Sequence, residues 1–234
     1  MHLTPAVKPS EARAAFGDSL GVGLGFVPLG LAYGALVTQS GLPWWWAGLA
    51  AALIFGGSFE FLLIGLVTAT APLASVALSA FMVNVRHVFY GLSFPLHRVP
   101  GRLGRAYSTF AMCDEAYALA TGEQARAWSG RRILWLQLFL HLYWAGSATA
   151  GALLGSLVPG VDGLDFALTA LFAVLALEAL RDVRGDLPTP VLALLSALTA
   201  RFLCPGELLP AAFALFTTAL LARHLTTRRK PSHA

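Results

Sequence analysis

The sequence predicts an all-α polytopic membrane protein, and three observations lead to this fold class. Apolar residues make up 57% of the 234 residues and charged residues only 12%, whereas roughly a quarter of the residues of a soluble domain are charged. The mean hydropathy is +0.69. The apolar residues come in long blocks, which is typical of transmembrane segments. These blocks cover residues 17–38, 44–69, 72–95, 106–121, 133–157, 164–180, 187–203 and 208–222.

We expect about six full transmembrane helices plus two broken or re-entrant segments, in one transmembrane domain over residues 15–223. The formal net charge of +4 does not point to a nucleic-acid partner, because Lys and Arg gather between the apolar blocks, where they set membrane orientation. The rule that basic residues stay inside makes both termini cytoplasmic. The expected cytoplasmic segments are residues 1–14, the loops around 98–105 and 126–132, the loop at Arg181, and the basic tail 224–234.

The first apolar block is rich in glycine and carries Pro28 in its middle. Small residues let helices approach closely in lipid, which favours a tightly packed, kinked helix. Proline removes one backbone donor, so a discontinuous helix with backbone groups open to a cavity is the alternative.

The second block, Trp44–Ala69, is interrupted by the run Gly56–Phe61. Two glycines weaken a helix by roughly 1 kcal/mol each, and Ser58 is a suitable N-cap for a second half-helix. Glu60 then falls in its first turn, where the helix dipole favours negative charge. A carboxylate at a helix break within the membrane is a candidate site, although Glu60 can instead serve only to pair with Arg86.

The third block carries four polar side chains within seven positions: Asn84, Arg86, His87 and Tyr90. A cation near the bilayer centre costs at least about 2.5–3.5 kcal/mol, so this cluster needs partners or a function. On a continuous helix, Asn84, His87 and Gly91 share one stripe, because they are spaced three and four residues apart. We expect this face to line a functional site.

The positive-inside rule identifies two apolar blocks that do not cross the membrane as one simple span. If every block crossed once, the loop at 98–105 would lie outside despite its arginines. The conflict disappears if Trp44–Ala69 enters and returns at its glycine break. The same reasoning makes Ala106–Thr121 an excursion that turns near Asp114 and Glu115. Irregular backbone survives at membrane depth only where it is buried in protein or lines a wet cavity.

Four sequence elements resemble those of the AzlC family, the large subunit of branched-chain amino acid exporters. The run Asn84-Val85-Arg86-His87-Val88-Phe89-Tyr90-Gly91 resembles its Asn/Asp-x-Arg-His-x-x-Tyr-Gly motif. Gly57-Ser58-Phe59-Glu60-Phe61 is similar to its Gly-(Ala/Ser)-x-(Gln/Glu)-Phe element, and Cys113-Asp114-Glu115 to its (Thr/Cys)-Asp-Glu element. Leu164–Leu168 resembles a later segment, so the likeness extends from about residue 14 to residue 222.

The resemblance implies a multi-pass protein of the bacterial inner membrane, surrounded by lipid, that exports branched-chain amino acids or similar small apolar zwitterions. It also implies a small multi-spanning AzlD-like partner subunit and no cofactor, metal or enzymatic activity. The residues suit such a substrate. The ammonium needs an acceptor such as Glu60 or Asp114, and the carboxylate needs Arg86 or the N–H groups that follow Gly57.

The remaining expectations concern the substrate side chain and the coupling ion. Phe59, Phe61, Met82 and Phe89 are candidates for an apolar pocket. His87 suits proton coupling, because the ordinary pKa of histidine lies near physiological pH. The expected site therefore comprises Gly57, Ser58, Glu60, Asn84, Arg86, His87, Tyr90, Asp114 and Glu115.

Two other classes of protein compete with a carrier. An intramembrane hydrolase is disfavoured, because neither a Gly-x-Ser-x-Gly nor a His-Glu-x-x-His context is present. A channel or a channel-like accessory subunit is the stronger alternative, since broken helices with an acid and a cation also build ion filters. ATP drive within this chain is disfavoured by the lack of a phosphate-binding loop motif.

Overall fold

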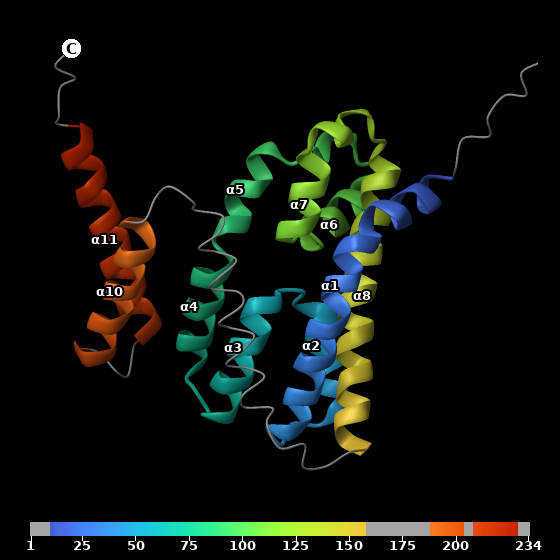
Figure 1. Cartoon of the computed structure of the whole chain (residues 1–234). Coiled ribbons are helices and arrows are strands. Elements are labelled where there is room, and N and C mark those ends of the chain that lie inside the picture. The colour runs from blue at the N-terminus through green and yellow to red at the C-terminus, as the bar shows by residue number, and fades with distance from the viewer. Residues whose placement is uncertain (1–9, 158–187, 204–207, 229–234) are drawn as a thin grey trace, which may run out of the picture. The chain divides into compact units, whose positions relative to one another are not determined.

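All secondary structure in the part of the chain that the computed structural model describes, residues 10–157, 188–203 and 208–228, is helical (Figure 1). The expected all-α class is confirmed for these residues. The expected span at 164–180 and the loop at Arg181 lie outside them. The described residues form two compact units, divided at Pro72 and Val83, and each unit is described by itself.

The first unit is built on two long helices that run parallel, α1 (Glu11–Gln39) and α8 (Gly130–Leu157) (Figure 1). Glycine makes their contact possible, because a Cβ on Gly34 would collide with backbone atoms of Ala148 and Ala152. Close approach of this kind is how helices associate in lipid. The expected tight packing is confirmed. The alternative of a discontinuous first helix is wrong, since α1 continues through Pro28.

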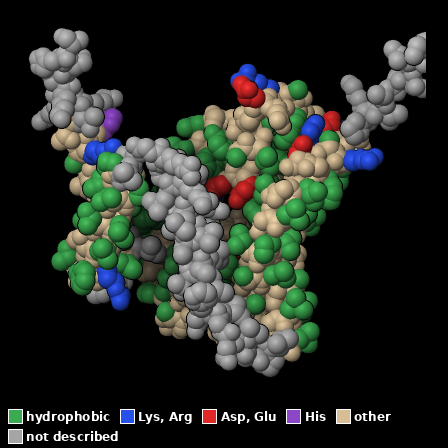
Figure 2. All heavy atoms as spheres, in the orientation of Figure 1, with side chains coloured by type: hydrophobic (Ala, Val, Ile, Leu, Met, Phe, Trp, Pro, Cys, Tyr) green, Lys and Arg blue, Asp and Glu red, His purple; other side chains and the backbone are tan. Residues whose placement is uncertain are grey.

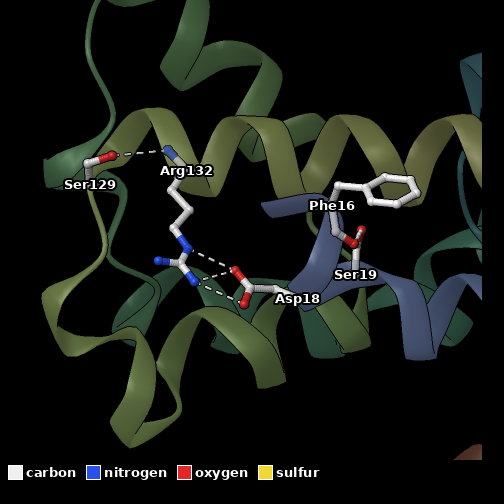
Figure 3. A network of polar contacts seen from close by, with 5 residues as sticks. All are labelled: Phe16, Asp18, Ser19, Ser129 and Arg132. Atoms are coloured by element: carbon white, nitrogen blue, oxygen red, sulfur yellow. Dashed lines mark hydrogen bonds and ion pairs between the residues drawn. The ribbon is translucent and has the colours of Figure 1, made fainter. Parts of the chain in front are cut away.

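An ion pair joins the beginnings of α1 and α8 (Figure 3). Arg132 Nε and Nη2 donate to the two carboxylate oxygens of Asp18 at 2.8 and 2.9 Å. The guanidinium carbon of Arg132 also lies 4.6 Å from the centre of the Trp128 ring, and Ser129 Oγ accepts from the Arg132 backbone N–H at 3.1 Å. A planar guanidinium suits this two-point contact, so the ends of both helices are held in one place.

The basic segments of the first unit gather at this same place. Arg98 donates to the carbonyl of Ala125 at 2.9 Å, and the backbone of Arg98 lies against Gly130 at the beginning of α8. The start of α1, the loop at 98–105 and the loop at 126–132 therefore lie together. We call this place the basic end of the unit.

Two pairs of shorter helices complete the first unit, each interrupted by three residues. The first pair is α2 (Trp44–Leu53) and α3 (Gly57–Thr68). The second pair is α6 (Arg102–Phe110) and α7 (Asp114–Thr121). The breaks cover residues 54–56 and 111–113 and so lie at or just before the predicted positions, Gly56–Ser58 and the region of Asp114 and Glu115. In Figure 1, α3 and α7 each run back from the break, opposite to α2 and α6.

The helices α2 and α6 approach one point of α8 from opposite directions. Along α2, Gly48 lies against Thr149, and the carbonyl of Ala52 then reaches His141. Along α6, which begins at the basic end, Gly104 lies against Leu134, and a tyrosine one turn later reaches the same His141. The two breaks are therefore neighbours near the middle of α8.

The predicted continuous helix from residue 72 to residue 95 is wrong in one respect, because it is interrupted at Val85. The helix α4 (Leu73–Asn84) ends there and α5 (Arg86–Ser93) begins. The two helices meet there at a bend of 41°. Two 3₁₀ turns, η1 (Leu96–Arg98) and η2 (Glu123–Ala127), join the later elements.

The second unit contains most of α4 together with α10 (Pro188–Leu203) and α11 (Leu208–Arg228). Arg223 of α11 donates to Thr189 Oγ1 of α10 at 2.8 Å. The sequence predicts one transmembrane domain over residues 15–223, and that remains a prediction.

Hydrophobic side chains are spread over the visible surface of the described helices, and charged side chains occupy a few small areas (Figure 2). Large apolar side chains are strongly exposed, among them Leu24 at 70% and Leu103 at 87%. Among the described residues, α1 alone is long and apolar enough to cross a membrane, and α4 with α5 is a second candidate if that broken pair counts as one span.

Candidate functional site

The first polar centre is built around Asp114, the first residue of α7. Its Oδ2 accepts from Arg86 Nη2 at 2.9 Å, and its Oδ1 accepts from the Tyr90 hydroxyl at 2.8 Å. The His87 ring nitrogen Nε2 lies 3.9 Å from the same Oδ1. Side chains from α5 thus converge on one carboxylate at the second break.

The Asp114 centre is partly exposed to solvent, and Tyr117 packs against it. The side chains of Arg86 and Asp114 are 46% and 40% exposed. The ring of Tyr117 stacks on Tyr90 at 4.3 Å between centroids, and its hydroxyl lies 2.7 Å from Ser93 Oγ. A half-exposed ion pair of this kind contributes little to stability, and this pair lies next to the second helix break.

Glu115 shares the first turn of α7 with Asp114. Its carboxylate lies close to the thiol of Cys113, the residue before the helix. Two acids in one first turn fit the positive end of the helix dipole. Glu115 therefore lies beside Asp114 at the second break.

The second polar centre is Glu60 at the first break. Its side chain is fully buried. Glu60 Oε1 accepts from the Gly56 N–H at 2.8 Å, and Trp144 Nε1 donates to Oε1 at 3.0 Å and to Oε2 at 3.2 Å. The suggestion that Glu60 pairs with Arg86 is wrong, because Arg86 pairs with Asp114 and Glu60 is held by an indole and a backbone amide.

The start of α3 also differs in detail from the sequence prediction. Gly56, not Ser58, is the N-cap, and no side chain caps this helix. Glu60 performs that task from inside the helix by binding the Gly56 N–H. Just before it, Phe55 has a φ of +48°. A bulky residue in the left-handed region costs of the order of 1–3 kcal/mol, and such strain is concentrated at functional breaks.

One face of α8 binds both breaks. It presents Gln137, His141 and Trp144 at spacings of four and three residues, which place them on the same side of a helix. Gln137 Nε2 donates to the carbonyls of Ser108 and Ala111 at 2.8 and 3.1 Å. Gln137 therefore binds two backbone carbonyls at the end of α6. Trp144 binds Glu60, which lies in the first turn of α3.

His141 connects the two breaks directly. Its Nε2 lies 3.2 Å from the carbonyl of Ala52 at the end of α2, and its Nδ1 lies 3.2 Å from the Tyr107 hydroxyl on α6. A carbonyl only accepts, so Nε2 carries the proton, and in a neutral ring Nδ1 then accepts from Tyr107. The ends of both half-helices are thus linked through one imidazole.

The structure brings the predicted site residues together in two groups. Arg86, His87 and Tyr90 meet Asp114. Gly57 begins α3 beside Trp144, and Asn84 lies at the first break, with Oδ1 3.6 Å from where a Cβ on Gly56 would stand. The stretch from Asn84 to Tyr90 therefore reaches both breaks.

Several contributing residues are absent from the sequence-based site. They are Tyr33, Ser93, Tyr107, Tyr117, Gln137, His141 and Trp144. A usable signal existed for three of them, namely the helical spacing of Gln137, His141 and Trp144 within an apolar block. Of the proposed apolar pocket residues, Phe61 lies next to Trp144, at 6.4 Å between ring centroids, whereas Phe89 is 64% exposed.

Comparison with known proteins identifies the family. Residues 21–158, more than half of the chain, match the family described as AzlC protein. The chain belongs to the AzlC family. The matched region contains both breaks and the whole of α8, so the two polar centres lie in the part that defines membership.

Relatives of known name agree with this assignment. The branched-chain amino acid transport protein AzlC of Bacillus subtilis is 35% identical over 171 residues, which cover 71% of this chain and 66% of that protein, just under two thirds of its length. An uncharacterized membrane protein of Haemophilus influenzae is 33% identical over 76% of this chain and 73% of its own. The inner membrane protein YgaZ of Escherichia coli is 28% identical over 72% and 75%, respectively. No solved structure matches the chain.

Membership settles three of the predictions. The resemblance to the AzlC family is confirmed. The chain is a membrane protein, as its relatives are named. It belongs to a transport family and not to a family of enzymes, which removes the hydrolase from consideration.

Proposed function

We propose that this chain is the large subunit of a secondary-active exporter of branched-chain amino acids or similar small apolar zwitterions. The observation that carries the proposal is the pair of helix breaks held by one face of α8. Each break is followed by an acid in the first turn of the next helix, and irregular backbone of this kind in a membrane protein lines a site. The name of the Bacillus relative supports the substrate class.

The two charges of the substrate suit the two polar centres. Arg86 is half exposed and already holds a carboxylate, that of Asp114. A substrate carboxylate that takes the place of Asp114 on Arg86 would free Asp114 to accept a proton. His87, within 4 Å of Asp114, is the natural group to exchange that proton, and this makes the export proton-linked.

The proposed topology follows from the basic end of the first unit. The start of α1 and the loops at 98–105 and 126–132 lie together there, and basic segments stay in the cytoplasm. The pair α6–α7 then enters from the cytoplasm and returns, and the pair α2–α3 enters from the opposite side. About six full spans accompany these two re-entrant pairs, with both termini cytoplasmic.

A small multi-spanning AzlD-like subunit completes the proposed exporter. The exposed apolar surface offers room for such a partner as well as for lipid. Co-purification of the chain with the small membrane protein expressed from the neighbouring gene tests this part of the proposal.

Cellular resistance tests the transport function. Cells that produce the chain should tolerate a toxic leucine analogue better than cells without it. Arg86→Ala and His87→Ala should abolish this tolerance while the protein remains in the membrane. The control is Arg126→Ala, whose side chain is 77% exposed and pairs only within its own turn. Unchanged tolerance in the Arg86 and His87 variants contradicts the proposal.

A channel is the second candidate, because the half-exposed Arg86–Asp114 pair resembles the charged constrictions of ion pathways. Counterflow in vesicles separates the two. A carrier shows saturable exchange of labelled for unlabelled leucine, whereas a channel shows conductance that does not saturate.

A further inference from the structure

Glu60 lies within a group of aromatic rings that the transport motifs do not include. The ring of Tyr33, on α1, lies 5.3 Å from the ring of Phe61 and 5.9 Å from that of Trp144. The ring of Phe26 closes the group at 5.9 Å from Trp144. Tyr33 also interacts electrostatically with Glu60. We call these four rings and the Glu60 carboxylate the aromatic cage.

The carboxylate in the cage has no cation beside it. Glu60 is fully buried, and among the described residues no Lys, Arg or His forms an ion pair with it. A charge that is buried without a partner is costly. Two N–H groups bind it, yet an ionised carboxylate offers about four acceptor positions, and Oε2 receives only the longer branch of the Trp144 bond.

A second polar group in the cage is also unsatisfied. The Tyr33 side chain is fully buried, and its hydroxyl has no hydrogen-bond partner in the structure. Buried hydroxyls are nearly always hydrogen-bonded, so an exception needs an explanation. The cage therefore contains a phenol oxygen and a carboxylate oxygen that are both short of partners.

A primary ammonium group meets these deficits together. It carries positive charge for Glu60, and its N–H groups can donate to Glu60 Oε2 and to the Tyr33 oxygen. The faces of tryptophan, tyrosine and phenylalanine attract cations, most strongly where water is excluded. A carboxylate would be repelled from the same place, and the Asp114 centre already offers Arg86 for it.

We infer that Glu60, Tyr33 and Trp144 bind the ammonium group of the transported amino acid, with Phe26 and Phe61 closing the cage. This inference rests on the proposed function. The cage is closed to solvent here, as an occluded state of a carrier requires, and substrate enters when the α2–α3 pair moves.

Two competitors that each lack one charge of leucine test the inference. The full chain, with any small subunit that co-purifies, is reconstituted in liposomes and assayed by counterflow of labelled leucine. One competitor is 3-methylbutylammonium, which has the side chain and the ammonium of leucine. The other is 4-methylpentanoate, which has the side chain and the carboxylate.

The variants should change recognition of one competitor only. A hydrogen bond to a charged group contributes about 1.5–3 kcal/mol, so Glu60→Gln and Tyr33→Phe should raise the inhibition constant of 3-methylbutylammonium about ten- to hundredfold. The constant of 4-methylpentanoate should stay the same. Arg86→Gln, which should itself lose counterflow, is compared by calorimetric titration, where it should weaken binding of 4-methylpentanoate and leave binding of 3-methylbutylammonium unchanged. Tyr143→Phe is the control, since its hydroxyl lies 3.3 Å from Ser19 Oγ, away from Glu60.

Tyr33→Phe separates a loss of amine recognition from a loss of folding. It removes only a hydroxyl without a partner, so the unfolding temperature should not fall. Equal inhibition constants in wild type and both variants, or an equal rise for both competitors, overturn the inference. If Glu60 holds only a proton, Glu60→Gln alters the pH dependence of exchange and leaves amine recognition intact, which also overturns it.

Failure of the proposed function has a different signature. Wild type then shows no leucine counterflow at all. In that case, calorimetric titration of the purified chain with 3-methylbutylammonium tests cation binding by the aromatic cage independently of transport. Saturable binding that Tyr33→Phe weakens supports a cation site, and no binding overturns it.

Discussion

At the scale of single residues, the two acids differ in what holds them. Asp114 is half exposed and is bound by a guanidinium and a phenol. Glu60 is fully buried and is bound only by neutral donors. An exposed pair can open at small cost, whereas a buried acid without a cation favours a positive ligand. The two carboxylates are therefore held in different ways at the two breaks.

The Arg86–Asp114 pair should be needed for transport but not for stability. Arg86→Ala, Asp114→Asn and the double variant should all lose leucine counterflow. Because the pair is half exposed, each should change the free energy of unfolding by no more than about 1 kcal/mol. The measurements are counterflow in liposomes and thermal unfolding in detergent.

The exposed Glu123–Arg126 pair provides the control for this experiment. Its charged atoms are 3.6 Å apart, and replacing both residues by alanine should leave counterflow unchanged. If the double variant of Arg86 and Asp114 recovers transport that the single variants lose, the pair is only structural and the prediction is wrong.

At the scale of helices, local chemistry explains which breaks the sequence predicts. The glycines at 56 and 57 and the acids at 60 and 114 are local signals inside apolar blocks, and both breaks were predicted from them. Pro28 is also a local signal, yet α1 continues through it. Tertiary packing decides that case, because α8 lies against α1 on both sides of Pro28, at Gly23 and at Gly30.

The partners of the site were harder to predict than the breaks. No spacing rule connects Glu60 to Trp144, 84 residues later, and a tryptophan in an apolar block is typical of packing. The interruption at Val85 has no glycine or proline next to it, so the sequence offers no local reason for it. Such features depend on contacts between distant segments, which a single sequence does not display.

The packing of α1 on α8 should be sensitive to one methyl group. In Gly34→Ala the new Cβ would meet backbone atoms of Ala148 and Ala152, which cannot move aside as a side chain does. Overpacking of this kind costs about 1–3 kcal/mol. Thermal unfolding of the protein in detergent should therefore show a lower midpoint for this variant than for wild type.

Gly25→Ala is the matched control on the same helix. No atom lies within 4 Å of the position that its Cβ would take, so this variant should be neutral or slightly stabilising, because alanine favours a helix over glycine by about 0.5–1 kcal/mol. Equal midpoints for the two variants would show that the contact between α1 and α8 is looser than described.

At the scale of the whole molecule, two half-helices end at the same imidazole from opposite directions. The α2–α3 pair and the α6–α7 pair both stop near the middle of α8, where His141 touches the end of α2 and Tyr107 of α6. If one break moves, the hydrogen bonds of the other change as well. A carrier needs such a link between its two sides, since only one may be open at a time.

This arrangement has a direct consequence for membrane topology, which labelling of single cysteines can measure. Arg102 begins α6 at the basic end, whereas Leu42 follows α1 at its opposite end. Because α1 runs once through the unit, Leu42→Cys should react with an impermeant maleimide added outside intact cells. Arg102→Cys should react only after the membrane is opened, since basic segments stay in the cytoplasm. Both variants are made in a background without Cys113 and Cys204, and that background without an added cysteine is the control. Reaction of both positions from the same side would mean that α1 does not cross the membrane, and the opposed entry of the two broken pairs would then be wrong.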